Sequence, residues 1–406
     1  MITLPASLNI EKIEDVISKI CEGQSNPELE LPISSKGFAF GGYAAAIQAV
    51  NTWASNNEKR ELIVKPSSLE VEEQLEHIVK YPHKFTAAMM AKKVSLNFDQ
   101  KMDVRKKVNS LAKAAIEQQS THSYGQNHGR LCWYSFVDHS SKGFDRNFYL
   151  SSTTQHAVPQ SLEQITNIIS SMVRKSSIVA GGSELLGKED ANELGRLFYE
   201  LFVNTHEHGS RGKNRNIWLK PATRVIYTYG INLSDDAVAN SISNNEVLQD
   251  YLSALGKTSR STNRFIEISI IDAGLGYSGR WLADNPKDGS FEQLTISNEY
   301  EILKKCFKFR STSSNNLVKG NGLPAVMANL TLLNGFMRVR SNRLSLYRDF
   351  VNQPFIEQEN DSYEFMDWDS RQKCNNNITQ KANAAGVSIT ILIPLVDKTE
   401  LEGNSL

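Results

Sequence analysis

The segment that most constrains the fold of this chain is Glu200 to Gly209, near the middle of the sequence. Glu200, Asn204 and His208 recur every four residues, so on a helix they form one polar stripe. The apolar residues before and among them have the spacing of a buried helical face: Leu194, Leu197, Phe198, Leu201 and Phe202. The pattern predicts a helix ending near Gly209. Its polar stripe lies at the border of the core, where it lines either a ligand pocket or a solvated edge.

A buried strand is predicted downstream at 265–271, because its apolar run is almost continuous. The strand leads into Asp272-Ala-Gly274-Leu-Gly276. An aspartate at the end of a buried strand suits purine recognition, since its carboxylate can accept the exocyclic amino proton of adenine. Gly274 and Gly276 would let the backbone approach the ring closely. The same pattern also occurs in ordinary turns.

Two further segments complete the pattern. Lys319-Gly320-Asn-Gly322-Leu323 directly precedes a helix predicted at 324–333. Glycines next to a helix N-terminus present free N–H groups and the positive end of the dipole, which together hold phosphate. The polar segment before it, 307–318, has the length of a mobile lid; Arg310 and Ser311 to Ser314 are either phosphate contacts or solvated lid residues. A final strand is predicted at 386–394.

Taken in this order and at these distances, the four segments resemble the nucleotide-binding boxes of the GHKL superfamily, which share an ATP-binding domain called the Bergerat fold. Its members include histidine kinases, type II topoisomerases, mismatch-repair ATPases, heat-shock chaperone ATPases and anti-sigma serine kinases. Glu200-x-x-x-Asn204 is similar to the N box. Asp272-x-Gly-x-Gly276 resembles the first glycine box of the family, and Gly320-x-Gly322-Leu323 resembles the second. The segment from Gly386 to Pro394 resembles the family's terminal strand.

The resemblance implies that ATP and Mg²⁺ are the cofactors. Asn204 would bind the metal through its amide oxygen, and Glu200 would polarise the attacking water as general base. Asp272 would anchor adenine, with space made by Gly274 and Gly276. The residues that would hold the phosphates are Lys319, Gly320, Gly322 and Leu323. The chain departs from the family at Val387, where threonine is usual, and Ser388 faces the other side of a strand.

Three classes of activity agree with these residues. The presence of both Glu200 and Asn204 favours an ATPase. Its hydrolysis cycle would drive closure of a lid or a change in a dimer, and the N-terminal part of the chain would respond to that change. His208-Gly209 most resembles the anti-sigma branch, which favours a protein serine/threonine kinase or an anti-sigma-like regulator. The third class is a nucleotide sensor that does not hydrolyse ATP. A sensor histidine kinase is disfavoured, because no phosphoacceptor motif precedes residue 190.

The predicted class is α+β with two domains. Residues 1–180 form an N-terminal α/β domain of unknown role. Residues 181–406 form a Bergerat-type sandwich, a mixed sheet with helices on one face, with insertions near 234–262 and 351–383. Gly41 and Gly42 are interpreted as turn and helix-packing residues, because no Lys-Ser/Thr pair follows them to make a phosphate loop.

Charge and composition bear on partners. With 45 basic and 45 acidic residues, the chain has no global attraction to nucleic acid or membrane. Residues 69–119 are predicted to be helical, with one buried stripe. The segment also carries a group of cations: Lys92, Lys93, Lys101, Arg105, Lys106, Lys107 and Lys113. These cations either bind nucleic acid or an acidic partner, or are simply solvated. A protein partner or homodimer is expected. The four separated cysteines indicate free thiols, and the N-terminus lacks a signal peptide, so a cytoplasmic protein is expected.

Overall fold

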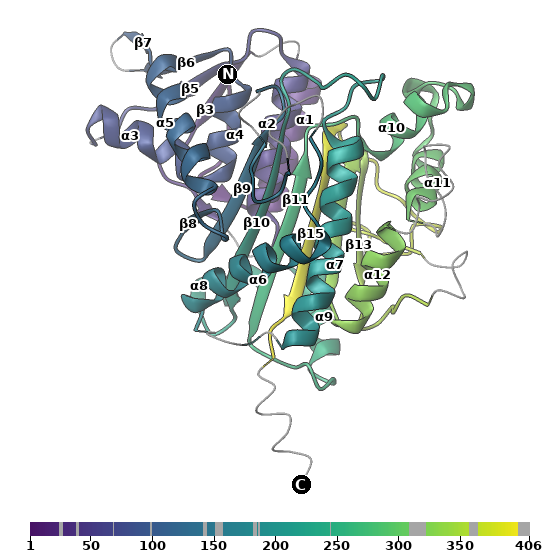
Figure 1. The fold of residues 1–406 in the computed structure, drawn as a ribbon. Helices are drawn as coiled ribbons and strands as arrows, with labels where there is room; N and C mark the ends of the chain where they lie inside the picture. The colour runs from purple at the N-terminus through teal and green to yellow at the C-terminus, as the bar shows by residue number, and fades with distance from the viewer. Residues whose placement is uncertain are drawn as a thin grey trace.

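The computed structural model of this chain shows an α+β protein with a small mixed sheet and a large antiparallel sheet (Figure 1). It describes residues 1–23, 27–37, 40–67, 69–97, 100–140, 144–150, 157–181, 185, 187–243, 245–307, 322–356 and 364–396. The predicted α+β class is confirmed. All four cysteines are free. No helix in these ranges is both long and apolar enough to cross a membrane.

The small sheet comes from the N-terminal part of the chain and has the order β1-β3-β5-β6-β7. Its strands are β1 (Ile2–Thr3), β3 (Glu28–Leu31), β5 (Glu61–Val64), β6 (Lys93–Asn97) and β7 (Lys101–Asp103). They pair in parallel except for β7, which runs antiparallel to β6. The helices of this part are α1 (Ile10–Glu22), α2 (Gly42–Asn56), α3 (Val71–Val79), α4 (Pro82–Met90) and α5 (Arg105–Gln119). A separate parallel pair joins β2 (Ser7–Leu8) to β4 (Lys36–Gly37).

The prediction that residues 69–119 are helical throughout is wrong between α4 and α5. Strand β6 inserts there beside β5, and its Val94 and Leu96 are fully buried. Lys101 consequently lies on β7 rather than on the basic helix. Burial of a short segment against an existing sheet has overridden the local helical pattern.

The large sheet has eight strands in the order β14-β13-β12-β15-β11-β10-β9-β8. They are β8 (Gln126–His128), β9 (Leu131–Val137), β10 (Thr223–Asn232), β11 (Arg264–Asp272), β12 (Phe336–Asn342), β13 (Leu344–Asp349), β14 (Met366–Asp367) and β15 (Ala384–Pro394). Strand β11 lies between β10 and β15, which confirms the predicted central strand. All the pairings between these described strands are antiparallel, so this sheet is not the predicted mixed sheet. Strands β8 and β9 belong to it although they precede residue 180, so the predicted domain boundary does not coincide with a break between sheets.

Helices cover both faces of the large sheet, whereas one covered face was predicted. On one face lie α6 (Leu162–Ile178), α7 (Lys188–Asn204) and α12 (Gly322–Leu332), packed on alternate residues of β11 and β15. Helix α2 packs against β15 and β11 on the other face. The physical reason is visible in β11, whose residues are buried at every position from Phe265 onward. A strand of this kind needs cover on both sides.

The remaining helices lie in the connections between these strands. They are α8 (Asp236–Ser243), α9 (Glu246–Leu255), α10 (Gly276–Asp284), α11 (Ile296–Cys306) and the short 3₁₀ turns Pro286–Asp288 and Phe291–Gln293. Helices α8 and α9 fall in the insertion predicted near 234–262. In the insertion predicted near 351–383, β14 adds a short strand at the edge of the sheet.

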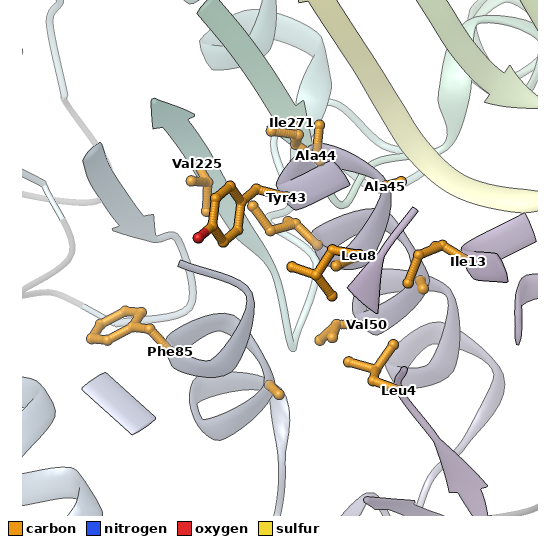
Figure 2. Packing of buried hydrophobic residues seen from close by; sticks show 14 of the residues in the cluster. Leu4, Leu8, Ile13, Tyr43, Ala44, Ala45, Val50, Phe85, Val225 and Ile271 are labelled. Atoms are coloured by element: carbon orange, nitrogen blue, oxygen red, sulfur yellow. The ribbon is translucent and has the colours of Figure 1, made fainter. Parts of the chain in front are cut away.

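Helix α2 is the centre of the contact between the two sheets. It is buried on every side from Gly42 to Ala54, and Figure 2 shows Tyr43, Ala44 and Val50 among side chains from the N-terminal strands, α4 and the large sheet. A Cβ at Gly42 would lie 2.1 Å from the carbonyl oxygen of Leu8. Gly41 has φ +81°. The glycines thus serve a turn and close packing, as predicted.

A buried ion cluster connects α1 with β12. Glu14 accepts hydrogen bonds from Arg340 Nε at 2.9 Å and from Arg338 Nη2 at 3.2 Å. The side chains of both arginines are at most 2% exposed. Burial alone would raise the pKa of Glu14, but the charges of Arg340 and Arg338 hold it at about 2. This cluster attaches the N-terminal part of the chain to the large sheet.

A second buried carboxylate holds the start of α2. Glu267 on β11 accepts hydrogen bonds from the backbone N–H groups of Phe40 and Gly41 and from the hydroxyl of Tyr227. Burial raises the pKa of Glu267 from 4.5 to about 7, against the opposing effect of these hydrogen bonds. The folded protein therefore binds this proton more tightly than the unfolded chain does. The contribution of Glu267 to the free energy of unfolding is largest below pH 4.5 and is lost as the pH rises to about 7.

We expect Glu267→Gln to remove this pH dependence. The amide oxygen can accept the two backbone N–H groups and its NH₂ can donate to Tyr227, while no charge is buried. Between pH 4.5 and 7.5 the variant should gain about 3 kcal/mol relative to the parent protein, measured by urea unfolding. Glu11→Gln, an exposed replacement on α1, is the control. Parallel stability curves for Glu267→Gln and the parent would contradict the prediction.

Candidate functional site

The site is centred on Asp272, the last residue of β11. Its carboxylate is buried, and Oδ1 accepts the backbone N–H groups of Gly274 at 2.8 Å and Val387 at 3.3 Å. Burial raises the pKa of Asp272 to about 6, and these two hydrogen bonds oppose the shift. Within the described ranges Oδ2 has no hydrogen-bond partner. The orientation of the carboxylate is thus fixed through one oxygen, and the other remains able to accept a proton from a ligand.

Three glycines allow three separate segments to meet at Asp272. A Cβ at Gly209, after α7, would lie 2.8 Å from Cβ of Asp272. One at Gly274 would lie 2.4 Å from the carbonyl oxygen of Gly209. Gly386 on β15 has φ +69°, and its Cβ would lie 1.9 Å from the carbonyl oxygen of Asp272. Three of the four predicted segments therefore come together in space.

The terminal strand contributes its backbone to this site. Val387 donates its N–H to Asp272, and its side chain packs on the core beneath α6, α7 and α12. Ser388 pairs with Ile271, whose side chain belongs to the cluster on the opposite face. Ser388 therefore does not replace the missing threonine side chain, as its position along the strand predicts.

Gly276, the second glycine of the first box, packs against a residue that the sequence pattern did not reveal. It begins α10 with φ +72°, and a Cβ there would lie 2.2 Å from Oδ1 of Asn342. Asn342 accepts the N–H of Ser278 at 3.2 Å and donates to the carbonyl of Leu275 at 3.0 Å. The glycine thus brings the loop after Asp272 against the end of β12. Nothing in the local sequence around Asn342 indicates this contact.

The helix predicted to end near Gly209 does so, but its last turn is not α-helical. Helix α7 ends at Asn204, and Thr205–Gly209 forms a π-helical turn. Hydrogen bonds in a π turn skip five residues instead of four, and single π turns occur frequently at functional sites. Glu200 and Asn204 keep the predicted spacing on α7. His208 lies in the π turn and leaves the stripe, which corrects the prediction of three aligned side chains.

Glu200 and Asn204 both have unusual surroundings. Burial, and after it the negative charge of Glu207, raises the pKa of Glu200. Nδ2 of Asn204 is buried and has no hydrogen-bond partner among the described residues. Buried polar atoms are nearly always paired with protein or water in native structures, so Nδ2 of Asn204 is a donor that water or a ligand can satisfy.

His208 holds the chain after α7 against α10. Its Nδ1 lies 3.2 Å from Nη1 of Arg215, which forms a second contact with Asp284 (Nε to Oδ1, 2.8 Å). Arg280 on α10 also binds Asp284 (Nε to Oδ2, 3.1 Å) and donates to the carbonyl of Gly212. Burial and then the charge of Arg215 lower the pKa of His208 to about 4, so the imidazole is neutral and accepts at neutral pH. Of this network, only the i, i+4 pair of Arg280 and Asp284 has a signal in the sequence.

A buried arginine lies beside Asp272. Arg224 on β10 is directly opposite Asp272 in the antiparallel pairing, so both side chains point to the same face. Its Nη2 donates to Asp138 at 2.7 Å and to the hydroxyl of Tyr149 at 2.8 Å, and that hydroxyl lies 3.2 Å from Nδ1 of His206. Its positive charge lowers the pKa of Asp272 and so favours the ionised carboxylate. The sequence pattern does not single out Arg224, because an arginine within an apolar strand gives no sign of its partner.

The fourth predicted segment is only partly visible. Lys319, Gly320, Arg310 and Ser311 to Ser314 lie outside the described residues. Gly322 begins α12, and Leu323 is buried in the same hydrophobic cluster as α7. Asn329 of α12 donates to the carbonyl of Glu193 on α7 at 3.5 Å. Helix α12 therefore packs against the helix that carries Glu200 and Asn204.

No three His, Cys, Asp or Glu side chains in the described ranges gather in a way that could hold a metal ion. Comparisons with protein-family models, with curated proteins and with solved structures found no match to this chain.

Proposed function

We propose that this protein binds ATP with Mg²⁺ and hydrolyses it, using a GHKL-type domain with the Bergerat fold. The observation that carries the proposal is the meeting of three predicted segments at Asp272. Gly209, Gly274 and Gly386 approach this carboxylate so closely that a side chain at any of them would collide with its surroundings. Segments so far apart in the chain have no other evident reason to leave one oxygen of a buried carboxylate available.

Asp272 is the proposed adenine anchor. Two backbone N–H groups hold Oδ1, so Oδ2 presents a lone pair in a fixed direction. Adenine carries an amino group that can donate to this oxygen, while guanine has a carbonyl at the corresponding position. The site should therefore prefer ATP to GTP.

Asn204 is the proposed metal ligand. The metal would be bound by the amide oxygen Oδ1, and the buried nitrogen Nδ2, which has no partner among the described residues, could donate to a phosphate oxygen. The absence of a cluster of carboxylates among the described residues also fits Mg²⁺, which is usually bound by one or two side chains together with substrate phosphates. When bound, Mg²⁺ neutralises phosphate charge. Asn204 would hold the metal, and with it the phosphates, one helical turn from Glu200.

Glu200 is the proposed general base, one helical turn before Asn204. Its raised pKa brings the carboxylate closer to the operating pH, which suits a group that must accept a proton from water. Protonation of Glu200 at low pH should therefore lower the rate of hydrolysis.

The N-terminal part of the chain contacts the backbone of the site directly. Asn51 of α2 donates to the carbonyl of Asp272 at 3.1 Å, and Thr52 accepts the N–H of Ala385 at 3.0 Å. In this proposal α2 is the element through which the hydrolysis cycle, acting through the predicted lid or a dimer, is coupled to the N-terminal part.

Asp272→Asn tests the proposal. The two N–H groups at Oδ1 require an acceptor, so the new amide must turn its NH₂ towards the adenine amino group, and two donors then face each other. Loss of a hydrogen bond to a charged group costs about 1.5–3 kcal/mol, so ATP should bind at least about tenfold more weakly by calorimetry. GTP, measured in parallel, should be affected less. Unchanged ATP affinity in a folded variant would remove Asp272 as the anchor.

A further inference from the structure

A cleft that shares no residue with the candidate site is lined by residues of α4, α5 and the end of β9. Two cavities of about 540 Å³ and 690 Å³ make up the cleft. Both are lined by Met89, Arg105 and His139, so they are continuous. Volumes of this size are typical of small-molecule sites.

One half of the cleft is cationic. Arg60, Lys92, Arg105 and Lys220 line it, together with a single carboxylate, Glu58. None of these four cations forms a salt bridge within the described ranges. Two neighbouring lysines behave differently, since Lys93 pairs with Glu61 and Lys101 with Glu28. The charges of Glu58 and Asp103 act on Arg60 and Arg105, but four cations face a single lining carboxylate, so this half keeps a net positive charge.

The guanidinium groups in this half are held in place. Arg60 donates to the carbonyls of Met90 at 3.0 Å and Asn57 at 3.1 Å, and Arg105 donates to the carbonyl of Ala88. Burial lowers the pKa of both arginines. Neutral carbonyls orient these side chains without cancelling their charge, which is the arrangement expected of a binding site for an anion.

The other half of the cleft has a mainly apolar surface, although polar side chains such as Asn109 and Ser120 also line it. Its lining includes Ala112 and Ile116 of α5 and Val137 at the end of β9, next to Met89. Lys113 also lines this half, but it lies 3.8 Å from Glu117. The cleft therefore offers an apolar surface and a cluster of cations side by side.

We propose that this cleft binds a small organic phosphate, with the phosphate group on Arg60, Lys92, Arg105 and Lys220 and an apolar body on Ala112, Ile116 and Val137. Arginine matches phosphate oxygens through paired N–H groups, and the lysines add charge. A nucleic acid fits the surface less well. No Phe, Tyr or Trp side chain lines the cleft among the described residues, and the imidazole of His139 is held at the carbonyl of Ala222, so successive bases have no extended stacking platform.

The test uses phenyl phosphate as the probe and calorimetry as the measurement. Lys92→Glu with Lys220→Glu reverses two exposed cations of the cleft, and Lys106→Glu with Lys107→Glu makes the same charge change on the outer side of α5. The first double variant should bind at least about tenfold more weakly, because charge-assisted hydrogen bonds are lost. The second should stay within about twofold, since distant exposed charges are screened by salt. Inorganic phosphate should bind the parent protein more weakly than phenyl phosphate.

Several results would overturn the proposal. They are absence of saturable binding to the parent protein, an equal loss in both double variants, and equal affinities for phenyl phosphate and inorganic phosphate. Tight binding of a single-stranded oligonucleotide that depends on Lys92 and Lys220 would instead assign the cleft to nucleic acid. Asp272→Asn should bind phenyl phosphate as the parent protein does, which separates this site from the proposed ATP site.

Discussion

Glu200→Gln is expected to lower the rate of ATP hydrolysis by at least about 100-fold, because general bases typically contribute 10²- to 10⁴-fold. The amide has nearly the same size as the carboxylate but cannot accept the proton of the attacking water. ATP affinity should change by less than about threefold, because the proposed contact of Glu200 is with the attacking water and not with the nucleotide. Single-turnover measurements with labelled ATP, together with calorimetric binding, separate the two quantities.

Glu207→Gln is the matched comparison for this experiment. The charge of Glu207 contributes to the raised pKa of Glu200, so its removal should shift the pH profile of hydrolysis to lower pH. An unchanged rate in Glu200→Gln would exclude Glu200 as the base. Labelled phosphate on a copurified protein would favour the serine/threonine kinase or anti-sigma-like alternative. Binding with neither product would favour the sensor.

Glu14→Ala should destabilise the protein by about 3–5 kcal/mol, the cost typical of removing one partner of a buried ion pair. The replacement leaves the guanidinium groups of Arg338 and Arg340 buried without a carboxylate. Because the pKa of Glu14 is lowered to about 2, its stabilising effect is present above pH 4.5 and is lost as the pH falls towards 2. As the pH falls from 4.5 to 2, the difference in free energy of unfolding between the parent protein and Glu14→Ala should therefore become much smaller.

Urea unfolding at pH 7 measures this cost. Asp15→Asn, an exposed change on the next residue of α1, should alter the free energy of unfolding by less than about 0.5 kcal/mol. A cost below about 1 kcal/mol for Glu14→Ala would show that α1 is not held to the large sheet by this cluster.

Much of the local structure around the site could be predicted, because its signals lie within a few residues of each other. The apolar run at 265–271 predicts a buried central strand, and β11 lies between β10 and β15. The spacing of Leu194 to Phe202 predicts the buried face of α7, and these side chains are in the core. Glycines beside Asp272 predict a close approach of backbone, which the geometry at Gly274 confirms.

Errors arose where a segment's structure depends on distant parts of the chain. The alternation of β6 is short, and only its place beside β5 makes it a strand. The covering of both sheet faces was also missed, since a buried strand does not reveal what covers it. The π turn at Thr205–Gly209 follows a regular helical pattern in sequence, so no periodicity marks it.

The sequence by itself determined the apolar face of α7, the buried central strand β11, and the glycines that follow Asn204 and Asp272 along the chain. These properties follow from contacts between residues at most a few positions apart. Only the tertiary structure decided which charges meet. Glu14 and Arg340 are 326 positions apart, and Asn51 reaches the backbone of Asp272 from 221 positions away. The cationic cleft likewise combines Arg60, Arg105 and Lys220. A buried or clustered charge acquires its partners through folding, and no local pattern records them.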